Sequence, residues 1–248
     1  MYPNFNYKNE MKKENLINTS LGEIVTDDFR AASVFKEAGL DFCCGGKKSL
    51  ADACSEKKIN PDPLVSKLME LENSSEGRGH NFSEWSPSFL ADYIVNTHHK
   101  YVLKSLPELL FYTDKIAKVH GERHEELIKV AELFSQINSE LLQHLKNEEE
   151  MLFPALKRVM DKSTEADRAL IRSEIDRMSG EHEFAGGAMD RINEMTMGYQ
   201  VPHDACNTYT VTMKLLGEFE DDLHIHVHLE NNILYPAALQ LANNKIKN

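Results

Sequence analysis

From residue 87 onward, apolar residues recur at intervals of three and four, with almost no strand-like alternation. That spacing puts the apolar side chains on one helix face and predicts amphipathic helices. Three polar breaks, "HGERH", "DKST" and "GYQVPHD", interrupt the pattern. It therefore predicts four long helices at about residues 87–118, 124–160, 165–197 and 205–243. Long helices joined by short loops are typical of an up-down-up-down four-helix bundle.

The preceding region is more polar and predicts shorter helices. "TDDFRAASVFKEAG", "KKSLADACSEKK" and "NPDPLVSKLMELE" each combine an apolar face with capping or proline signals. Residues 1–20 are rich in Asn and Lys and predict a flexible tail. The Gly- and Ser-containing stretch 73–86 predicts a linker. We therefore expect an all-α protein: a tail (1–20), a small helical Cys-containing domain (21–72), a linker (73–86) and a four-helix bundle (87–243).

Composition narrows the functional classes. The formal net charge is −12 and the isoelectric point about 5.4, which argues against general binding to nucleic acid or anionic membranes. No apolar run approaches the roughly 20 residues of a membrane span, and the first residues lack a secretory signal pattern. The four cysteines show no repeated spacing, which argues against a disulfide framework. A cytoplasmic protein is expected.

Two stretches of the bundle repeat one another: "HLKNEEEMLFPAL" from residue 144 and "HVHLENNILYPAAL" from residue 226. The copies lie 82 residues apart, counted from His144 to His226 or from Glu148 to Glu230. Residues four apart share a helix face. A solvated charge stripe would not need the same residue types in the same register twice. Each copy carries an acid, a histidine and a glutamate at four-residue steps: Glu140, His144 and Glu148, then Asp222, His226 and Glu230.

The other two predicted helices each offer a histidine at a matching place. His99 and His182 lie 83 residues apart, so a helical hairpin bearing one histidine and one HxxxE motif is used twice. His99 lies about 28 Å from the following turn, and the return to His144 covers about 30 Å, at 1.5 Å per residue. These two histidines therefore reach one level of the bundle. His98 is the alternative to His99; the face of His99 is more apolar, which favours an inward position.

Four imidazoles and two carboxylates at one level predict a metal centre, because such groups are costly to bury without partners. The set suits two first-row metals bridged by Glu148 and Glu230, and favours iron or manganese over zinc. An oxo or hydroxo bridge would leave one position open on each iron, for small molecules or for metal release. Glu140 and Asp222 are expected to orient the imidazoles from outside. Histidine preceding glutamate by four residues departs from the Glu-x-x-His motif of ferritin-like sites.

A second unusual stretch is "GLDFCCGGKKSL", with adjacent Cys43 and Cys44. Two glycines allow a tight turn, and a helix is expected to begin near Ser49. Thiols close to a helix N-terminus have lowered pKa values and react more readily. The alternative is that both cysteines are small buried hydrophobes. The sequence leaves both interpretations open.

The bundle resembles the hemerythrin-like fold. "GLDFCCGG", followed by a linker and a bundle with "EEEMLFP" and "HLENNILYP", resembles the iron-sulfur cluster repair di-iron proteins, also called regulators of cell morphogenesis and nitric-oxide signalling. The resemblance covers about residues 21–243. It implies a cytoplasmic, often dimeric protein that restores clusters damaged by nitric oxide or oxidants. It also implies bridging Glu148 and Glu230, a functional pair Cys43 and Cys44, and ligands His99, His144, His182 and His226.

Three functions are compatible with these features. The leading hypothesis is an iron donor, whose labile di-iron centre supplies iron to damaged iron-sulfur client proteins, with nitric oxide or oxygen species as small ligands. Cys43 and Cys44 would accept iron, react with nitric oxide or dock the client. The second is a turnover enzyme, a di-iron nitric oxide reductase or peroxide scavenger. The third is a hemerythrin-like oxygen carrier or sensor, which leaves the cysteine pair without a purpose.

Overall fold

The computed structural model describes residues 13–74 and 80–244, and the described residues are helices, turns and loops with no strand. They form two compact units. The first comprises residues 1–85 together with 228–233, and the second comprises 86–227 together with 234–248. None of the described helices is long and apolar enough to cross a membrane. The expected all-α class is confirmed.

The described part of the first unit includes the short α-helices α2 (Leu21–Asp27), α3 (Ala31–Glu37), α4 (Leu50–Lys57) and α5 (Asp62–Asn73). Its core is apolar and includes Val25, Phe35, Leu50 and Val65. The stretch 26–39, expected as one helix, contains α3, which begins at Ala31 after the chain turns at Asp28, the C-cap of α2. The preceding helix α2 was not expected. Most of the expected tail lies outside the described residues, but residues 13–18 are helical.

Ser20 begins α2 through a capping box. Its hydroxyl accepts a hydrogen bond from the backbone N–H of Glu23, and the Glu23 carboxylate accepts one from the backbone N–H of Ser20. The motif satisfies two backbone donors that a helix N-terminus otherwise leaves open. The chain is therefore already ordered at residue 20. Of the expected linker, residues 75–79 lie outside the described residues, and a 3₁₀ turn, η1 (Phe82–Glu84), follows.

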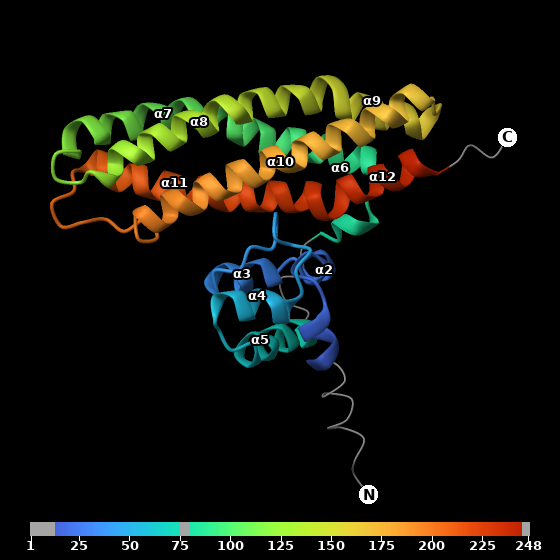
Figure 1. The fold of residues 1–248 in the computed structure, drawn as a ribbon, viewed down its shortest axis with the longest axis horizontal. Coiled ribbons are helices and arrows are strands. Elements are labelled where there is room, and N and C mark those ends of the chain that lie inside the picture. Colours follow the sequence, from blue (N-terminus) through green and yellow to red (C-terminus); the bar gives the residue numbers. More distant parts are fainter. Residues whose placement is uncertain (1–12, 75–79, 245–248) are drawn as a thin grey trace, which may run out of the picture. The chain divides into compact units, whose positions relative to one another are not determined.

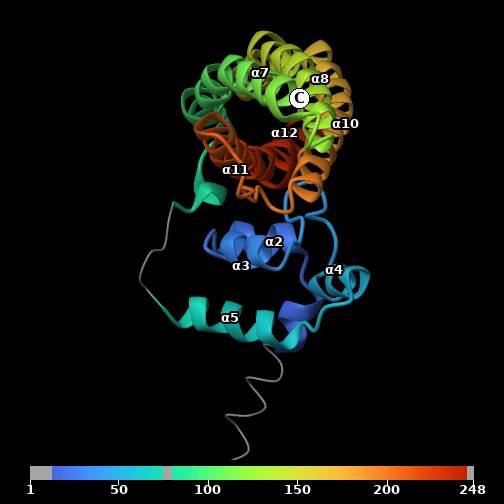
Figure 2. The same ribbon diagram turned by 90° about the vertical axis from the view of Figure 1, so that its left-hand side faces the viewer.

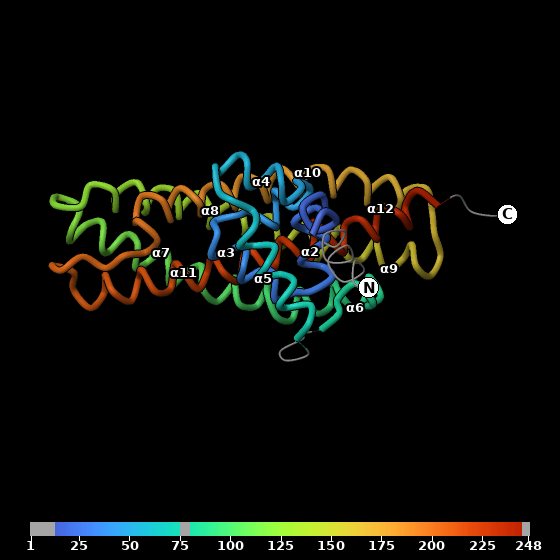
Figure 3. The backbone as a smooth tube through the Cα atoms, turned by 90° about the horizontal axis from the view of Figure 1, so that it is seen from below, coloured from blue at the N-terminus to red at the C-terminus, as the bar shows by residue number. Residues whose placement is uncertain are grey.

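The second unit is the four-helix bundle, whose helices run antiparallel in sequence order (Figures 1 and 2). Its first three helical runs are α6–η2–α7 (Pro87–Ile94, Val95–His99, Lys100–His120), α8–η3–α9 (Glu126–Asn147, Glu148–Leu152, Phe153–Asp161) and α10 (Glu165–Met195). The fourth run is α11–η4–α12 (Asn207–His228, Leu229–Leu234, Tyr235–Asn243), whose segment 228–233 belongs to the first compact unit. The turns between α7 and α8 and between α10 and α11 lie at one end, and α9 and α12 at the other (Figure 3).

Three of the four runs are interrupted by a π-helical segment, η2, η3 or η4. Pro154 and Pro236 are the second residues of α9 and α12, which follow η3 and η4. A proline lacks the N–H that would bond the carbonyl four residues earlier, and its ring crowds that carbonyl. A wider π turn relieves both problems. No proline accompanies η2.

Candidate metal centre

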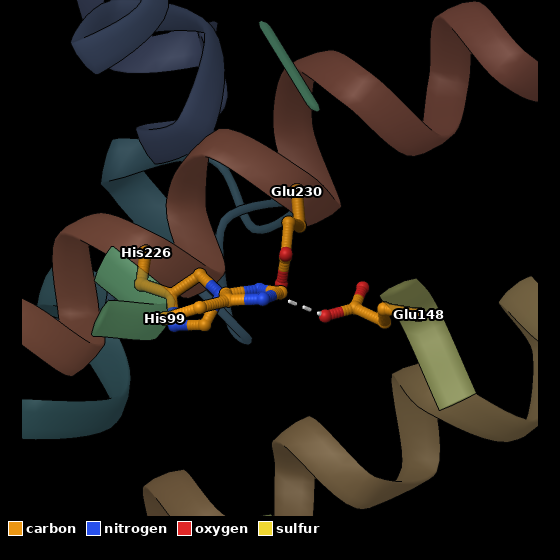
Figure 4. A group of neighbouring side chains, drawn as sticks. All are labelled: His99, Glu148, His226 and Glu230. Atoms are coloured by element: carbon orange, nitrogen blue, oxygen red, sulfur yellow. Dashed lines mark ion pairs between the residues drawn. The ribbon is translucent and has the colours of Figure 1, made fainter. Parts of the chain in front are cut away.

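The six residues expected as ligands meet inside the bundle. His99, Glu148, His226 and Glu230 place one ligand atom each within 4.8 Å of one another, and His144, His182 and Glu230 do the same. Figure 4 shows the first group, with His99 and His226 directed toward the two glutamates. Glu230 belongs to both groups. All six side chains are buried, and both glutamates are 0% exposed.

Glu148 links the two groups from the opposite side. Its Oε2 lies 3.3 Å from Nε2 of His99 and 3.3 Å from Nε2 of His144. Nε2 of His144 in turn lies 3.1 Å from Nε2 of His182. Each glutamate is therefore placed between two sets of imidazole nitrogens. This is the arrangement that the bridging role predicted for Glu148 and Glu230 requires.

The π-helical segments supply several of these positions. His99 ends η2, Glu148 begins η3 and Glu230 lies in η4. His182 lies in the interior of the uninterrupted α10. π segments inside α-helices are frequently found at functional sites. Three such segments therefore coincide with three of the expected ligand positions at this level of the bundle.

Two ligand histidines are oriented by carboxylates that the sequence analysis did not name. Nδ1 of His99 lies 2.8 Å from Oε1 of Glu149, and Nδ1 of His144 lies 2.8 Å from Oε2 of Glu181. When the Nδ1–H group donates its hydrogen bond to the carboxylate, the Nε2 lone pair faces the cluster, as a metal ligand must. His144, with a further contribution from Arg177, holds the pKa of Glu181 below its ordinary value.

The two carboxylates expected to orient the imidazoles lie elsewhere. Glu140 is exposed on α8. Oδ1 of Asp222 bonds Nδ1 of His98, at 2.9 Å, rather than one of the six expected ligands. A bundle seam alternates steps of three and four residues. Leu141, three residues before His144, and Leu223, three before His226, occupy the seam, which leaves Glu140 and Asp222 at its flanks.

His98 and His99 are both buried, so burial alone does not distinguish the two candidates. His99 faces Glu148, whereas His98 stacks on His226 with ring centroids 5.6 Å apart. His98 is therefore a packing neighbour of an expected ligand, and its hydrogen bond to Asp222 holds its ring in place.

Tyr235 was also missed and contacts both halves of the cluster. Its hydroxyl donates a hydrogen bond to Oε1 of Glu148 at 2.7 Å, and its ring stacks on His182 at 5.6 Å. The signal was present in the sequence, because Tyr235 is the aromatic residue of the second repeat and Phe153 that of the first. Phe153 stacks on His99 at 5.8 Å. The repeated aromatic thus packs against a ligand imidazole in each half.

The donor set fits first-row metal ions, because it offers imidazole nitrogens and carboxylate oxygens in two overlapping groups. When bound, such ions supply redox and small-molecule binding chemistry. The chain contributes buried carboxylates, imidazole nitrogens and a glutamate that belongs to both groups. The structure therefore brings together His99, His144, Glu148, His182, His226 and Glu230, the six residues expected as ligands.

The cysteine turn is organised by Asp41 within the first unit. Its Oδ1 accepts backbone N–H bonds from Cys43 at 2.9 Å and Cys44 at 3.0 Å, and its Oδ2 one from Gly45 at 2.7 Å. Asn232 of η4 donates to the carbonyl of Cys43 at 3.2 Å. Gly46 is required here, since a Cβ would stand 2.5 Å from the Phe42 carbonyl and 2.7 Å from Asn232 Oδ1.

The environment of Cys43 is the reverse of an activated thiol. A hydrogen bond with Cys44, burial and the nearby Asp41 charge raise the pKa of Cys43 well above its ordinary value. The helix α4 begins at Leu50 after its cap Ser49, as expected. The alternative of a lowered pKa is wrong for Cys43, whose burial agrees with the other interpretation. Asp41, Cys43 and Cys44 nevertheless bring one ligand atom each within 4.8 Å of one another.

Comparison with known proteins agrees with this architecture. Residues 17–72 match the ScdA_N domain, a domain of unknown function (DUF542), and residues 90–238 match the hemerythrin HHE cation binding domain. The chain is 32% identical over 216 residues to the iron-sulfur cluster repair protein ScdA of Staphylococcus epidermidis, covering 87% of this chain and 95% of that protein.

Two further relatives carry the same description. The chain is 36% identical over 225 residues to the iron-sulfur cluster repair protein YtfE of Pectobacterium carotovorum, covering 89% of this chain and 96% of that protein. The ScdA of Staphylococcus haemolyticus is 34% identical over 217 residues, covering 87% and 95%. The hemerythrin match spans more than half of the chain, and these relatives align along nearly all of it. The chain therefore belongs to the family of iron-sulfur cluster repair proteins, which the sequence resemblance had indicated.

Proposed function

We propose that this protein holds two iron ions between its six buried ligands and donates iron to damaged iron-sulfur clusters of client proteins. The observation that carries the proposal is the position of Glu230, which belongs to both histidine-rich groups and can serve two metals. The relatives named as repair proteins support the cluster-repair role.

Release rather than permanent retention is favoured by the ligand set. Neutral imidazoles dominate it, and their metal bonds compete with protons. Each group provides three or four protein atoms, fewer than six-coordinate iron needs. The remaining positions accept small ligands such as nitric oxide or oxygen species. A centre of this kind can lose iron without unfolding the bundle, whose core lies above and below it.

The cysteine turn is proposed as the place where iron passes to a client. Asp41, Cys43 and Cys44 offer one carboxylate and two thiols, a soft set suited to iron. Because the pKa of Cys43 is raised, this thiol stays protonated and unreactive at neutral pH until a metal ion displaces the proton. The Asn232 bonds connect the turn to η4, the segment that carries Glu230. The turn therefore lies against the segment that holds a shared ligand.

Isotope transfer tests the proposal. The protein is loaded with ⁵⁷Fe and mixed with a client whose cluster was damaged by nitric oxide and contains natural-abundance iron. We expect the client's activity to return as ⁵⁷Fe enters its rebuilt cluster, in proportion to ⁵⁷Fe lost from the donor. A Cys43→Ser, Cys44→Ser variant should stay loaded but transfer slowly.

Two outcomes would overturn iron donation. Recovery of the client with no label in its cluster would mean that the protein supplies electrons or removes nitric oxide instead. Consumption of nitric oxide over many cycles without iron loss would identify the turnover enzyme. A Glu140→Gln variant is the matched control, because Glu140 is an exposed acid one turn from His144 and should not affect transfer.

A further inference from the structure

The α7–α8 and α10–α11 turns lie at one end of the bundle (Figure 3), and a histidine and a cysteine stand next to these turns in the sequence. Cys206 is exposed and directly precedes α11. His120 is the last residue of α7, and its Nε2 lies 3.1 Å from the sulfur of Cys206. A thiol that is both exposed and paired with an imidazole differs from the three other cysteines of the chain.

The only hydrogen-bond contact of the His120 ring among the described residues is with the Cys206 sulfur. The side chain is only 4% exposed, and its Nδ1 is buried without a hydrogen-bond partner among the described residues. When the ring is neutral and carries its proton on Nε2, the Nε2–H group donates a hydrogen bond to a thiolate and only a lone pair remains at Nδ1. The opposite tautomer would bury an unmatched N–H, which costs more. The buried environment thus favours the tautomer that stabilises a thiolate.

Backbone groups act in the same direction. The N–H groups of Thr208 and Tyr209, in the first turn of α11, also hydrogen-bond the sulfur. The first N–H groups of a helix have no partner inside it and favour a negative charge. Together with His120, whose hydrogen bond is the largest cause, they lower the pKa of Cys206 to about 7.

The neighbouring charges are mostly matched with one another. Nε2 of His124 lies 3.1 Å from Oδ1 of Asp204 and its Nδ1 3.2 Å from Glu126, while Arg123 lies 3.4 Å from Asp204. The His124 bond holds the pKa of Asp204 below its ordinary value. The Tyr209 ring packs edge-on against both His120 and His124, and the His120 and His124 rings also lie edge-on to each other at 6.5 Å, but both nitrogens of His124 face Asp204 and Glu126 rather than the sulfur. His120 is therefore the titratable side chain in direct contact with the thiol.

The metal centre does not account for this pair. Cys206 and His226 are 20 residues apart on one continuous helix, which is about 30 Å. His120 and Cys206 are also distant in sequence from the Cys43–Cys44 turn. The pair is therefore a site separate from both.

We propose that Cys206 is a reactive-thiol site, at which the thiolate held by His120 and the α11 N-terminus exchanges with low-molecular-weight disulfides. The Cys206 sulfur attacks one sulfur of the disulfide. A new S–S bond forms to Cys206, the original S–S bond breaks, and the leaving thiolate takes the electron pair and then a proton from water. Cys206 is oxidised, and half of the added disulfide is reduced. A second thiol reverses the reaction.

Site-resolved alkylation of the iron-loaded protein tests the activation. Iodoacetamide is added at pH values from 5.5 to 9.5, and mass spectrometry measures the alkylation rate at each cysteine. We expect the Cys206 rate to rise with a midpoint near pH 7. At pH 6.5 it should exceed that of an ordinary thiol of pKa about 8.5 roughly five-fold, after allowing for the lower nucleophilicity of the more acidic thiol. Cys54, which is 1% exposed, is the internal negative control.

His120→Leu tests the cause. The substitution removes the donor from an already buried position, and we expect the Cys206 midpoint to move toward pH 8.5. Circular dichroism and iron content verify that the variant is folded. If the variant fails to fold, the midpoint of the wild-type profile still decides. A wild-type midpoint at or above pH 8.5, or a folded His120→Leu variant with an unchanged midpoint, would overturn the proposal.

The disulfide step is measured with oxidised glutathione at pH 7. The expected product is one mixed disulfide, located at Cys206, removed by reductant and absent in Cys206→Ser. A mixed disulfide at Cys44 in preference to Cys206, or a disulfide between two copies of the chain as the sole product, would contradict the assignment. Because the site is remote from the ligands, iron content should be the same before and after modification.

Discussion

The hydroxyl of Tyr235 donates a hydrogen bond to the fully buried carboxylate of Glu148 at 2.7 Å. The same Tyr235 ring stacks on His182 at 5.6 Å and an interplanar angle of 3°. One side chain therefore fixes two expected ligands that come from different helices. Hydrogen bonds to a buried anion are strong, because the low dielectric around them does not screen the charge.

Tyr235→Phe is expected to weaken iron binding about ten-fold, because Glu148 loses a donor that orients it. The ring remains, so the stacking on His182 and the bundle itself should persist. Competition with a chelator, followed by iron analysis, measures the affinity. Tyr209→Phe is the control, since Tyr209 is a similarly buried tyrosine of the same helical run near its other end. Equal loss in both variants would show a general effect of removing a tyrosine hydroxyl.

Replacing the carboxylates that hold the imidazoles should have a comparable effect. Glu149→Gln and Glu181→Gln leave His99 and His144 with a weaker acceptor at Nδ1, and we expect each to lower iron affinity about 10- to 100-fold. Glu150→Gln removes the same charge from an exposed neighbour and should change little. If all three variants lost iron equally, overall charge rather than imidazole orientation would be the cause.

Two glycine substitutions should change stability in opposite directions. A Cβ at Gly46 would meet the Phe42 carbonyl at 2.5 Å, so Gly46→Ala is expected to destabilise the first unit by about 1–3 kcal/mol. Gly180 lies inside α10, and a Cβ there would meet nothing within 4 Å. Gly180→Ala should stabilise the bundle by about 0.5–1 kcal/mol through helix propensity. Thermal denaturation monitored by circular dichroism compares them, and stabilisation by Gly46→Ala would refute the close packing of that turn.

Glu220 supplies a pH-dependent prediction. Burial raises its pKa, although the nearby His224 and a hydrogen bond from Asn193 oppose the effect. The unfolded chain therefore loses this proton at a lower pH, near 4.3, than the folded chain does. Ionisation of Glu220 therefore favours the unfolded chain. The stability that neutral Glu220 contributes is fully present below the pKa of the unfolded chain and is lost as pH rises through the higher pKa of the folded protein.

Glu220→Gln stays neutral and can still accept the hydrogen bond from Asn193. The variant should melt above the wild type at pH 7.5, and the difference should shrink toward pH 4.5. Glu218→Gln, on the exposed face of the same helix, should show no such trend. A variant less stable than the wild type at pH 7.5 would mean that Glu220 is ionised and well stabilised in the folded protein.

The repeated motifs made the bundle and its ligands predictable. His144 and Glu148, and likewise His226 and Glu230, are four residues apart on a helix face, a relationship that depends on backbone geometry alone. The equal hairpin lengths then determined the level that His99 had to reach. Helix bounds were also close, since 165–197 was expected and α10 runs from Glu165 to Met195.

The surroundings of the ligands were less predictable. Glu181 orients His144 from another helix, and a contact between side chains 37 residues apart leaves no local periodic signal. Glu149 directly follows a ligand, so a regular helix would turn it away by about 100°, and the π segment changes that direction. The raised pKa of Cys43 depends on burial and on Asp41, which the short motif alone does not reveal.

The number of iron ions in Glu230→Ala, compared with the wild type, tests the central claim most directly. Elemental analysis of reconstituted wild-type protein should find about two irons per chain. Because Glu230 belongs to both ligand groups, its removal should lower that value to one or fewer, whereas Glu140→Gln should keep two. A wild type that binds a single zinc ion, or a Glu230→Ala variant that retains two irons, would contradict a di-iron centre built on a shared glutamate.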